Sequence, residues 1–141
     1  MLAPIRILLV DDFQLWRHLV QSMLKKHTEV RLVGEAADGL AAIQRAFKLK
    51  PDLILMDIGL PNLNGIHAAE QIRRSIPSTK ILFLAFNNDS QVIRMLLDSG
   101  AHGYVLKTDA ATELLPAIEA VVQGRHYVSK GLTDFGSIEA A

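Results

Sequence analysis

The sequence has 141 residues, 50% of them apolar and 21% charged, which is the balance of a single globular domain. Fifteen acidic residues match fifteen lysines and arginines, so no overall positive charge favours direct binding of this chain to DNA. The absence of cysteine excludes disulfides and thiolate metal sites and fits a reducing compartment. No apolar stretch approaches the roughly 20 residues of a membrane helix, and no signal-peptide pattern opens the chain, so we expect a cytoplasmic protein.

Short apolar runs alternate along the chain with longer segments of helical period, a pattern typical of strands and helices around a parallel sheet. The runs are almost continuously apolar, which indicates strands that are buried on both faces. The predicted strands cover residues 5–10, 30–36, 53–56, 81–86 and 103–107.

The segments between these runs carry apolar residues at three- and four-residue spacing, which predicts amphipathic helices. Prolines follow the second and third segments and glycines end the last two, as expected at helix C-termini. Pro116 lies in the last segment, so we expect that helix to begin near 110–112, with the missing N–H in or close to the first turn. The predicted helices cover residues 13–27, 38–50, 64–75, 90–100 and 111–124.

Five strands and five helices in strict alternation predict an α/β fold with a doubly wound (βα)5 parallel sheet in the flavodoxin-like order 2-1-3-4-5. We expect one domain over residues 1–125 and a C-terminal tail or linker over 126–141, where the periodicity is weak. In such sheets, ligands bind beyond the carboxyl ends of the strands, near the point where the strand order reverses. The residues that follow the strands are therefore the candidates for a functional site.

Charged residues stand at three of these strand ends. Asp11 and Asp12 follow the first strand, Asp57 follows the third, and Lys107 ends the fifth. Carboxylates so close together raise a pKa or recruit a cation, and oxygen ligands without histidine or cysteine favour a hard ion such as Mg²⁺. A carboxylate beside a divalent cation and a lysine is equipped to attack a phosphoryl group, so we expect Asp57 to be a phosphoacceptor. The alternative is that each acidic residue only caps the next helix.

Three motifs resemble the receiver domains of two-component response regulators, which have the CheY-like form of this fold. They are "ILLVDDFQLWR", "PDLILMDIGLPNLNGI" and "GAHGYVLKTDA", and the resemblance spans about residues 5–123. It implies that a sensor histidine kinase transfers its phosphoryl group to Asp57, and that the domain then signals by a conformational change. It also implies that the domain is not an enzyme and promotes only its own phosphotransfer and dephosphorylation.

The resemblance assigns roles to the charged residues at the strand ends. Asp12, Asp57 and the backbone carbonyl of Gly59 correspond to the groups that hold Mg²⁺ or Mn²⁺, and Asp11 helps through water. Lys107 corresponds to the lysine that binds the phosphoryl group.

Two positions depart from the receiver pattern. Receivers normally carry threonine or serine at the end of the fourth strand and then a small residue, where this chain has Ala85 and Phe86. The missing hydroxyl removes a contact with the phosphoryl group that is worth about 1.5–3 kcal/mol if charge-assisted. We therefore expect weaker switching through Ala85, Phe86 and Tyr104, the residue that matches the aromatic switch of the family. Phe86 is also expected to narrow access to Asp57.

Pro61 and Gly65 match the loop that shapes the receiver site, and the segment "ELLPAIEAVVQGRHYVS" resembles the NarL/LuxR-type branch of the family. A helix-turn-helix output domain usually follows there, and the remaining residues are too few for one. We therefore expect DNA binding only if a separate output domain exists. The fourth helix, fifth strand and fifth helix of receivers often form a homodimer face, for which "VIRMLLDSGAHGYV" is the candidate here.

Two other functions compete with phosphate signalling. A pseudo-receiver would bind a partner without phosphorylation, which the missing hydroxyl at Ala85 makes a serious alternative. A hydrolase of the haloacid-dehalogenase kind needs a second carboxylate two residues after its nucleophile, where Gly59 stands, and is disfavoured. Trp16 is expected to be a packing residue, and the histidines at 18, 27, 67, 102 and 126 are expected at the surface.

Overall fold

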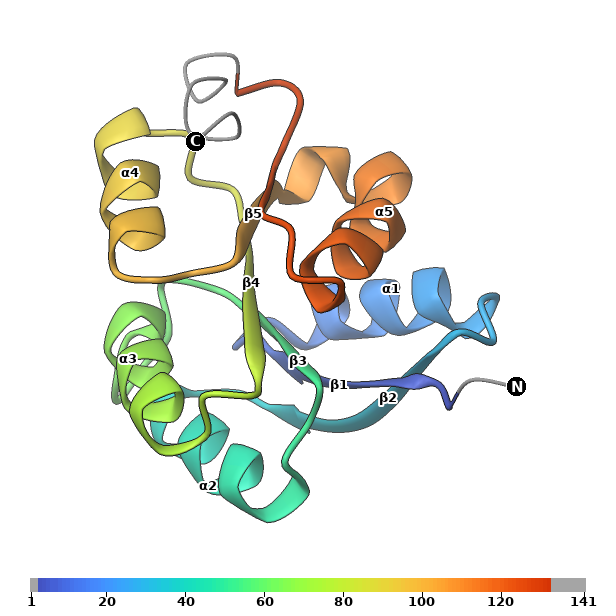
Figure 1. The fold of residues 1–141 in the computed structure, drawn as a ribbon, viewed down its shortest axis with the longest axis horizontal. Coiled ribbons are helices and arrows are strands. Elements are labelled where there is room, and N and C mark those ends of the chain that lie inside the picture. The colour runs from blue at the N-terminus through green and yellow to red at the C-terminus, as the bar shows by residue number, and fades with distance from the viewer. Residues whose placement is uncertain (1–2, 133–141) are drawn as a thin grey trace.

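The computed structural model describes residues 3–132 as one parallel sheet with helices on both faces (Figure 1). The strand order is β2-β1-β3-β4-β5-β6, so the expected order 2-1-3-4-5 is confirmed and a short sixth strand is added. The strands are β1 (Ile5–Val10), β2 (Val30–Ala36), β3 (Leu53–Met56), β4 (Lys80–Ala85), β5 (Gly103–Leu106) and β6 (Tyr127–Val128). The helices are α1 (Gln14–Lys25), α2 (Gly39–Leu49), α3 (Gly65–Ser75), α4 (Ser90–Asp98), the 3-10 helix η1 (Lys107–Asp109) and α5 (Ala110–Val122).

The sheet separates two apolar cores. Helices α2, α3 and α4 cover one face, and α1 and α5 cover the other (Figure 1). Successive residues of β1 point to opposite faces, so Leu8 and Val10 pack in the first core while Ile7 and Leu9 pack in the second. All four residues of β3 are buried, which confirms the expectation for this central strand, whereas most of the edge strand β2 is partly exposed. No helix within residues 3–132 is long and apolar enough to span a membrane.

The predicted helix ends are largely confirmed. Gly100 and Gly124 have φ values of +102° and +89°, the left-handed conformation that suits glycine just after a helix. Helix α5 begins at Ala110, as expected, and Pro116 lies in its second turn, next to the first. Pro116 and Thr112, whose carbonyl loses its usual donor, are both exposed, so water can replace the missing hydrogen bond.

Strand β6 attaches the segment after α5 to the outer edge of β5. The Tyr127 N–H donates to the His102 carbonyl at 3.3 Å, and the Ser129 N–H donates to the Tyr104 carbonyl at 2.9 Å. The Ser129 hydroxyl in turn accepts from the Leu106 N–H at 2.8 Å. The Tyr127 hydroxyl donates to the Glu113 carboxylate at 2.7 Å. The first residues of the expected tail therefore pack on the sheet.

His102 corrects the expectation of surface histidines. It is half-buried, and its Nδ1 accepts the Ile81 N–H at 3.0 Å. Burial, followed by the charges of Lys80 and Arg73, lowers the pKa of His102 to about 4. At neutral pH this ring is therefore an uncharged acceptor at the start of β5.

Gly65 provides a test of the packing that supports the loop after β3. A Cβ on Gly65 would lie 2.1 Å from the Asp57 carbonyl oxygen, whereas a Cβ on Gly59 would meet nothing within 4 Å. Gly65→Ala should therefore destabilise the fold by about 1–3 kcal/mol, because backbone must move to make room. Urea unfolding should show a lower midpoint for Gly65→Ala than for the wild type, with Gly59→Ala as the matched control. Equal midpoints for the two variants would contradict this packing.

Candidate functional site

The carboxyl ends of three strands bring the predicted charged residues together. Val10 and Met56 pair between β1 and β3, so Asp11 and Asp57 follow at the same edge of the sheet. The Asp57 N–H continues this pairing by donating to the Val10 carbonyl at 3.0 Å. Oxygen atoms of Asp11, Asp12 and Asp57 all lie within 4.8 Å of one another. The topology therefore collects three carboxylates where the strand order reverses.

Lys107 completes the cluster from the end of β5. Its ammonium lies 2.6 Å from Oδ2 of Asp11 and 3.8 Å from Oδ2 of Asp57. Asp11 is 2% exposed, and its other oxygen accepts the Phe13 N–H at 2.9 Å. Both oxygens of Asp11 are thus engaged. In contrast, Asp12 is exposed and makes no hydrogen bond or ion pair with any residue in the described part of the chain.

Helix capping does not account for these carboxylates. Only one oxygen of Asp11 serves the start of α1, through the Phe13 N–H. The helix after β3 begins well beyond Asp57, and it is capped by Asn64, whose side chain accepts the His67 N–H at 3.0 Å. Asp12 and Asp57 therefore remain available for another role.

Burial is the largest influence on the Asp57 carboxyl and raises its pKa above the ordinary value of 3.8. The Lys107 ammonium opposes this effect, and the neighbouring Asp11 carboxylate adds to it. The sequence predicted that repulsion between the carboxylates would raise a pKa or recruit a cation. At Asp57, desolvation raises the pKa more than the repulsion from Asp11 does.

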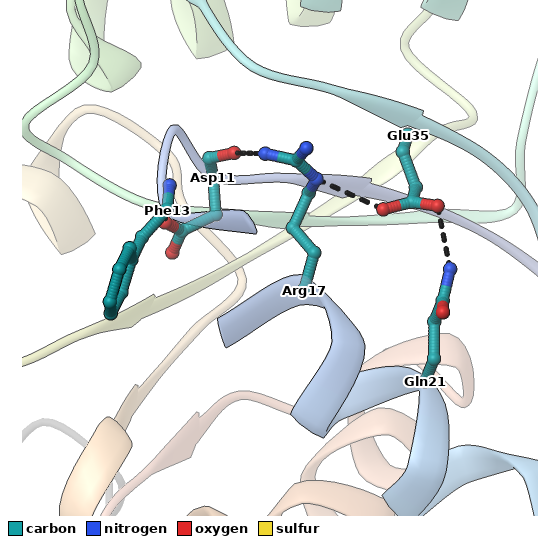
Figure 2. Close-up of polar contacts among 5 residues, drawn as sticks. All are labelled: Asp11, Phe13, Arg17, Gln21 and Glu35. Atoms are coloured by element: carbon teal, nitrogen blue, oxygen red, sulfur yellow. Dashed lines mark hydrogen bonds and ion pairs between the residues drawn. The ribbon is translucent and has the colours of Figure 1, made fainter. Parts of the chain in front are cut away.

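A polar chain that sequence reasoning missed fixes α1 next to the site (Figure 2). The Arg17 guanidinium donates to the backbone carbonyl of Asp11 at 2.5 Å and to the Glu35 carboxylate of β2 at 3.0 Å. Gln21, one turn further along α1, donates to the other oxygen of Glu35 at 2.6 Å. These bonds connect α1 with the ends of β1 and β2. They set the position of Trp16, the neighbour of Arg17, beside the site.

Trp16 and Phe86 lie against Lys107. The prediction that Trp16 packs in the core is confirmed, since it is buried among residues of α1, α5 and the sheet. The Phe86 side chain is 64% exposed, and its ring centroid lies 6.0 Å from that of Trp16. The Lys107 ammonium is 5.1 Å from both centroids. Phe86 therefore borders the site. That it narrows access to Asp57 stays a prediction.

The two other residues linked to switching are buried. Ala85 ends β4 inside the core and offers no hydroxyl to the site. Tyr104 of β5 is fully buried, and its hydroxyl donates to the carbonyl of Asn87. Burial raises the pKa of this hydroxyl well above its ordinary value, so it remains a donor.

The loop after β3 is shaped by backbone contacts. The Pro61 carbonyl accepts the Leu63 N–H at 2.7 Å and the Gly39 N–H at 3.4 Å. The Gly65 N–H donates to the Ile58 carbonyl at 2.8 Å. Gly59, two residues after Asp57, is exposed in this loop.

This fold, with three carboxylates and a lysine at its switch point, is that of a signalling receiver domain. Residues 7–119 match the response regulator receiver domain family, and the chain belongs to that family. It is 40% identical over 116 residues to the response regulator VraR of Staphylococcus saprophyticus, covering 82% of this chain. It is 36% identical over 129 residues to the transcriptional regulatory protein DegU of Brevibacillus brevis, covering 92% of this chain. The match covers 55% of each of these two proteins.

Solved receiver structures agree with this assignment. A LuxR-family two-component response regulator from Aurantimonas sp. SI85-9A1 superposes with a TM-score of 0.89 at 31% identity, covering 97% of this chain and 98% of that one. The isolated receiver domain of RcsB from Salmonella enterica serovar Typhimurium, solved with the phosphomimetic BeF3⁻, gives a TM-score of 0.86 at 27% identity. This second match covers 93% of this chain and 97% of that one.

The raised pKa of Asp57 predicts a pH-dependent effect of its charge on stability. A carboxyl whose pKa is raised in the folded state favours folding below about pH 3.8, and this contribution is lost as the pH rises through the folded-state value. Without divalent cations, Asp57→Asn should therefore melt at a higher temperature than the wild type at pH 7. The difference should shrink toward pH 3.8.

The control is Glu119→Gln, which removes an exposed carboxylate from α5, distant in sequence from the acidic cluster. Its melting temperature should follow that of the wild type across the same pH range. An Asp57→Asn variant that melts no higher than the wild type at pH 7 would contradict the account of Asp57.

Proposed function

We propose that Asp57 of this receiver domain accepts a phosphoryl group from the phosphohistidine of a sensor histidine kinase. The observation that carries the proposal is the partly exposed Asp57 carboxylate, placed 3.8 Å from the Lys107 ammonium and next to two further carboxylates. A carboxylate in this position attacks phosphorus while a cation accompanies the phosphoryl oxygens.

The donor set fits a magnesium or manganese ion. Three carboxylates within 4.8 Å of one another supply the oxygen ligands that such ions prefer. Because Lys107 and the Phe13 N–H engage both oxygens of Asp11, we assign direct ligation to Asp12 and Asp57 and assign Asp11 a contact through water. The Gly59 carbonyl, in the exposed loop after Asp57, is the proposed backbone ligand.

The chemistry of transfer follows from these positions. An oxygen of Asp57 forms a bond to phosphorus while the bond from phosphorus to the histidine nitrogen breaks, and that nitrogen keeps the electron pair. A bound divalent ion supplies further positive charge to the phosphoryl oxygens. Lys107 binds the group once it is in place. Attack of water on phosphorus later breaks the new P–O bond and returns Asp57 as a carboxylate.

The remaining proposals concern the rest of the protein. We assign the receiver to residues 1–125 and a connecting segment to 126–141, whose first part packs on β5 through β6. Since the chain spans about half the length of its curated relatives, DNA binding would belong to a separate output domain. A homodimer through α4, β5 and α5 would include β6, because this strand covers the outer edge of β5. The half-exposed Met95 of α4 offers an apolar contact for such a dimer.

A phosphate-independent interaction module is the second candidate, and one observation favours it. Tyr104 is already buried, and its hydroxyl is hydrogen-bonded to the Asn87 carbonyl. Ala85 has no hydroxyl that could bond to a phosphoryl group and move toward it. A switch that is already in one position gives phosphate little to select. The complete set of carboxylates and lysine is the reason for ranking this candidate second.

Phosphorylation is tested by incubating the chain with Mg²⁺ and acetyl phosphate and measuring its intact mass. The wild type should gain one phosphoryl group, because Asp57 is accessible beside Lys107. Asp57→Asn should gain none, and Lys107→Met should gain it more slowly. A wild type that gains no mass from acetyl phosphate and none from a phosphorylated kinase domain would favour the interaction module.

Metal binding has a readout that is independent of phosphorylation. Adding Mg²⁺ should raise the melting temperature of the wild type, because an ion that binds only the folded state stabilises it. Asp12→Asn should lose most of this rise, since Asp12 is the exposed carboxylate of the cluster. The rise should persist in Glu119→Gln. If Asp12→Asn and the wild type respond equally to Mg²⁺, the ligand assignment is wrong.

A further inference from the structure

The Lys107 ammonium lies near two carboxylates, those of Asp11 and Asp57, and near two aromatic rings. We call the rings of Trp16 and Phe86 the aromatic pair. It contacts Asp11 at 2.6 Å and lies 5.1 Å from the centroid of each ring. The two ring planes are tilted by 56° relative to each other, and the same ammonium lies over both rings. Both distances fall within the range in which an aromatic ring attracts a cation.

The two rings come from different elements and have different surroundings. Trp16 is buried on α1, which Arg17 fastens to β1 and β2. Its indole N–H is buried without a hydrogen-bond partner among residues 3–132. Trp16 therefore interacts with Lys107 through its ring and not through a hydrogen bond. Phe86 follows β4 and keeps a large apolar side chain in solvent, which normally costs free energy. The Phe86 ring lies beside the Trp16 ring and the Lys107 ammonium.

We propose that Trp16 and Phe86 are positioning residues for Lys107, holding its ammonium on Asp11 and away from Asp57 until a phosphoryl group arrives. This inference rests on the proposed phosphotransfer to Asp57. The ammonium is 2.6 Å from Asp11 and 3.8 Å from Asp57, so on phosphorylation it can exchange its contact with Asp11 for one with phosphoryl oxygens on Asp57. In this proposal, that exchange also takes the ammonium out of its contact with the rings. The aromatic pair thus favours the unphosphorylated arrangement.

The alanine at position 85 makes the position of Lys107 more important for phosphoryl binding. Because Ala85 offers no hydroxyl at the end of β4, binding of the phosphoryl group depends more on Lys107, which lies 3.8 Å from Asp57. Any interaction that holds Lys107 in its resting place therefore opposes phosphoryl binding directly. Weakening the aromatic pair should tighten binding of a phosphoryl analogue by about two- to fivefold, the equivalent of one exposed cation–π contact.

Trp16 is the single tryptophan of the chain, so its fluorescence reports on this contact without labelling. A nearby ammonium quenches indole emission. In the resting protein, Lys107→Met should therefore emit more strongly than the wild type. Addition of beryllofluoride with Mg²⁺ should raise the emission of the wild type and leave that of Lys107→Met unchanged. Identical resting emission in the two proteins would overturn the inference.

The affinity for beryllofluoride, measured by competition with a phosphorylation assay in Mg²⁺, tests the positioning role. Phe86→Leu keeps apolar bulk but removes the ring, and it should bind two- to fivefold more tightly than the wild type. Phe86→Tyr keeps a ring and should restore wild-type affinity. Phe47→Leu, which changes a half-exposed phenylalanine on α2, is the matched control. Thermal melts of each variant confirm that it is folded.

The outcomes separate this inference from the proposed function. Phosphorylation of the wild type on Asp57, with Phe86→Leu, Phe86→Tyr and the wild type all binding equally, would overturn the positioning role and leave the proposed function intact. Failure of the wild type both to gain phosphate and to bind beryllofluoride would overturn both. Tighter binding by Phe86→Leu alone, together with brighter resting emission of Lys107→Met, supports the inference.

Discussion

The buried ion pair between Lys107 and Asp11 is the contact on which the site depends. It joins the end of β5 to the end of β1 across the intervening strands, over 96 residues of sequence. Removing one partner of such a pair leaves an uncompensated buried charge, which typically costs about 3–5 kcal/mol. Lys107 thus contacts Asp11 more closely than Asp57, which lies 3.8 Å from the same ammonium. One cation thus organises both the resting cluster and the place of reaction.

Much of this arrangement could be predicted from the sequence, because it follows from backbone topology. Apolar runs of strand length alternate with helical periods, and the carboxyl ends of parallel strands share one edge. This reasoning predicts that Asp11, Asp57 and Lys107 lie close together, and their side chains do so in the structure. The boundaries of β1, β2 and β3 were also predicted as observed, and in β1 and β3 the apolar run ends at an aspartate.

The missed features depend on packing between distant elements. Strand β6 has two residues, too few to show a period, and it is held by bonds to the backbone and to Glu113. His102 is half-buried and hydrogen-bonded to the Ile81 N–H, a contact between distant residues that no local sequence pattern predicts. The contact of Trp16 with Lys107 depends on how Arg17 fastens α1 to the sheet. Apolar spacing identified Trp16 as a core residue without revealing its charged neighbour.

The central claim is that Asp57 is the residue that carries the phosphoryl group. The most direct test is to treat the phosphorylated chain with borohydride, which reduces an acyl phosphate to an alcohol, and to sequence its peptides by mass spectrometry. The account predicts homoserine at position 57 and unchanged aspartate at positions 11 and 12. Homoserine at position 11 or 12, or a phosphoryl group that resists reduction, would contradict it.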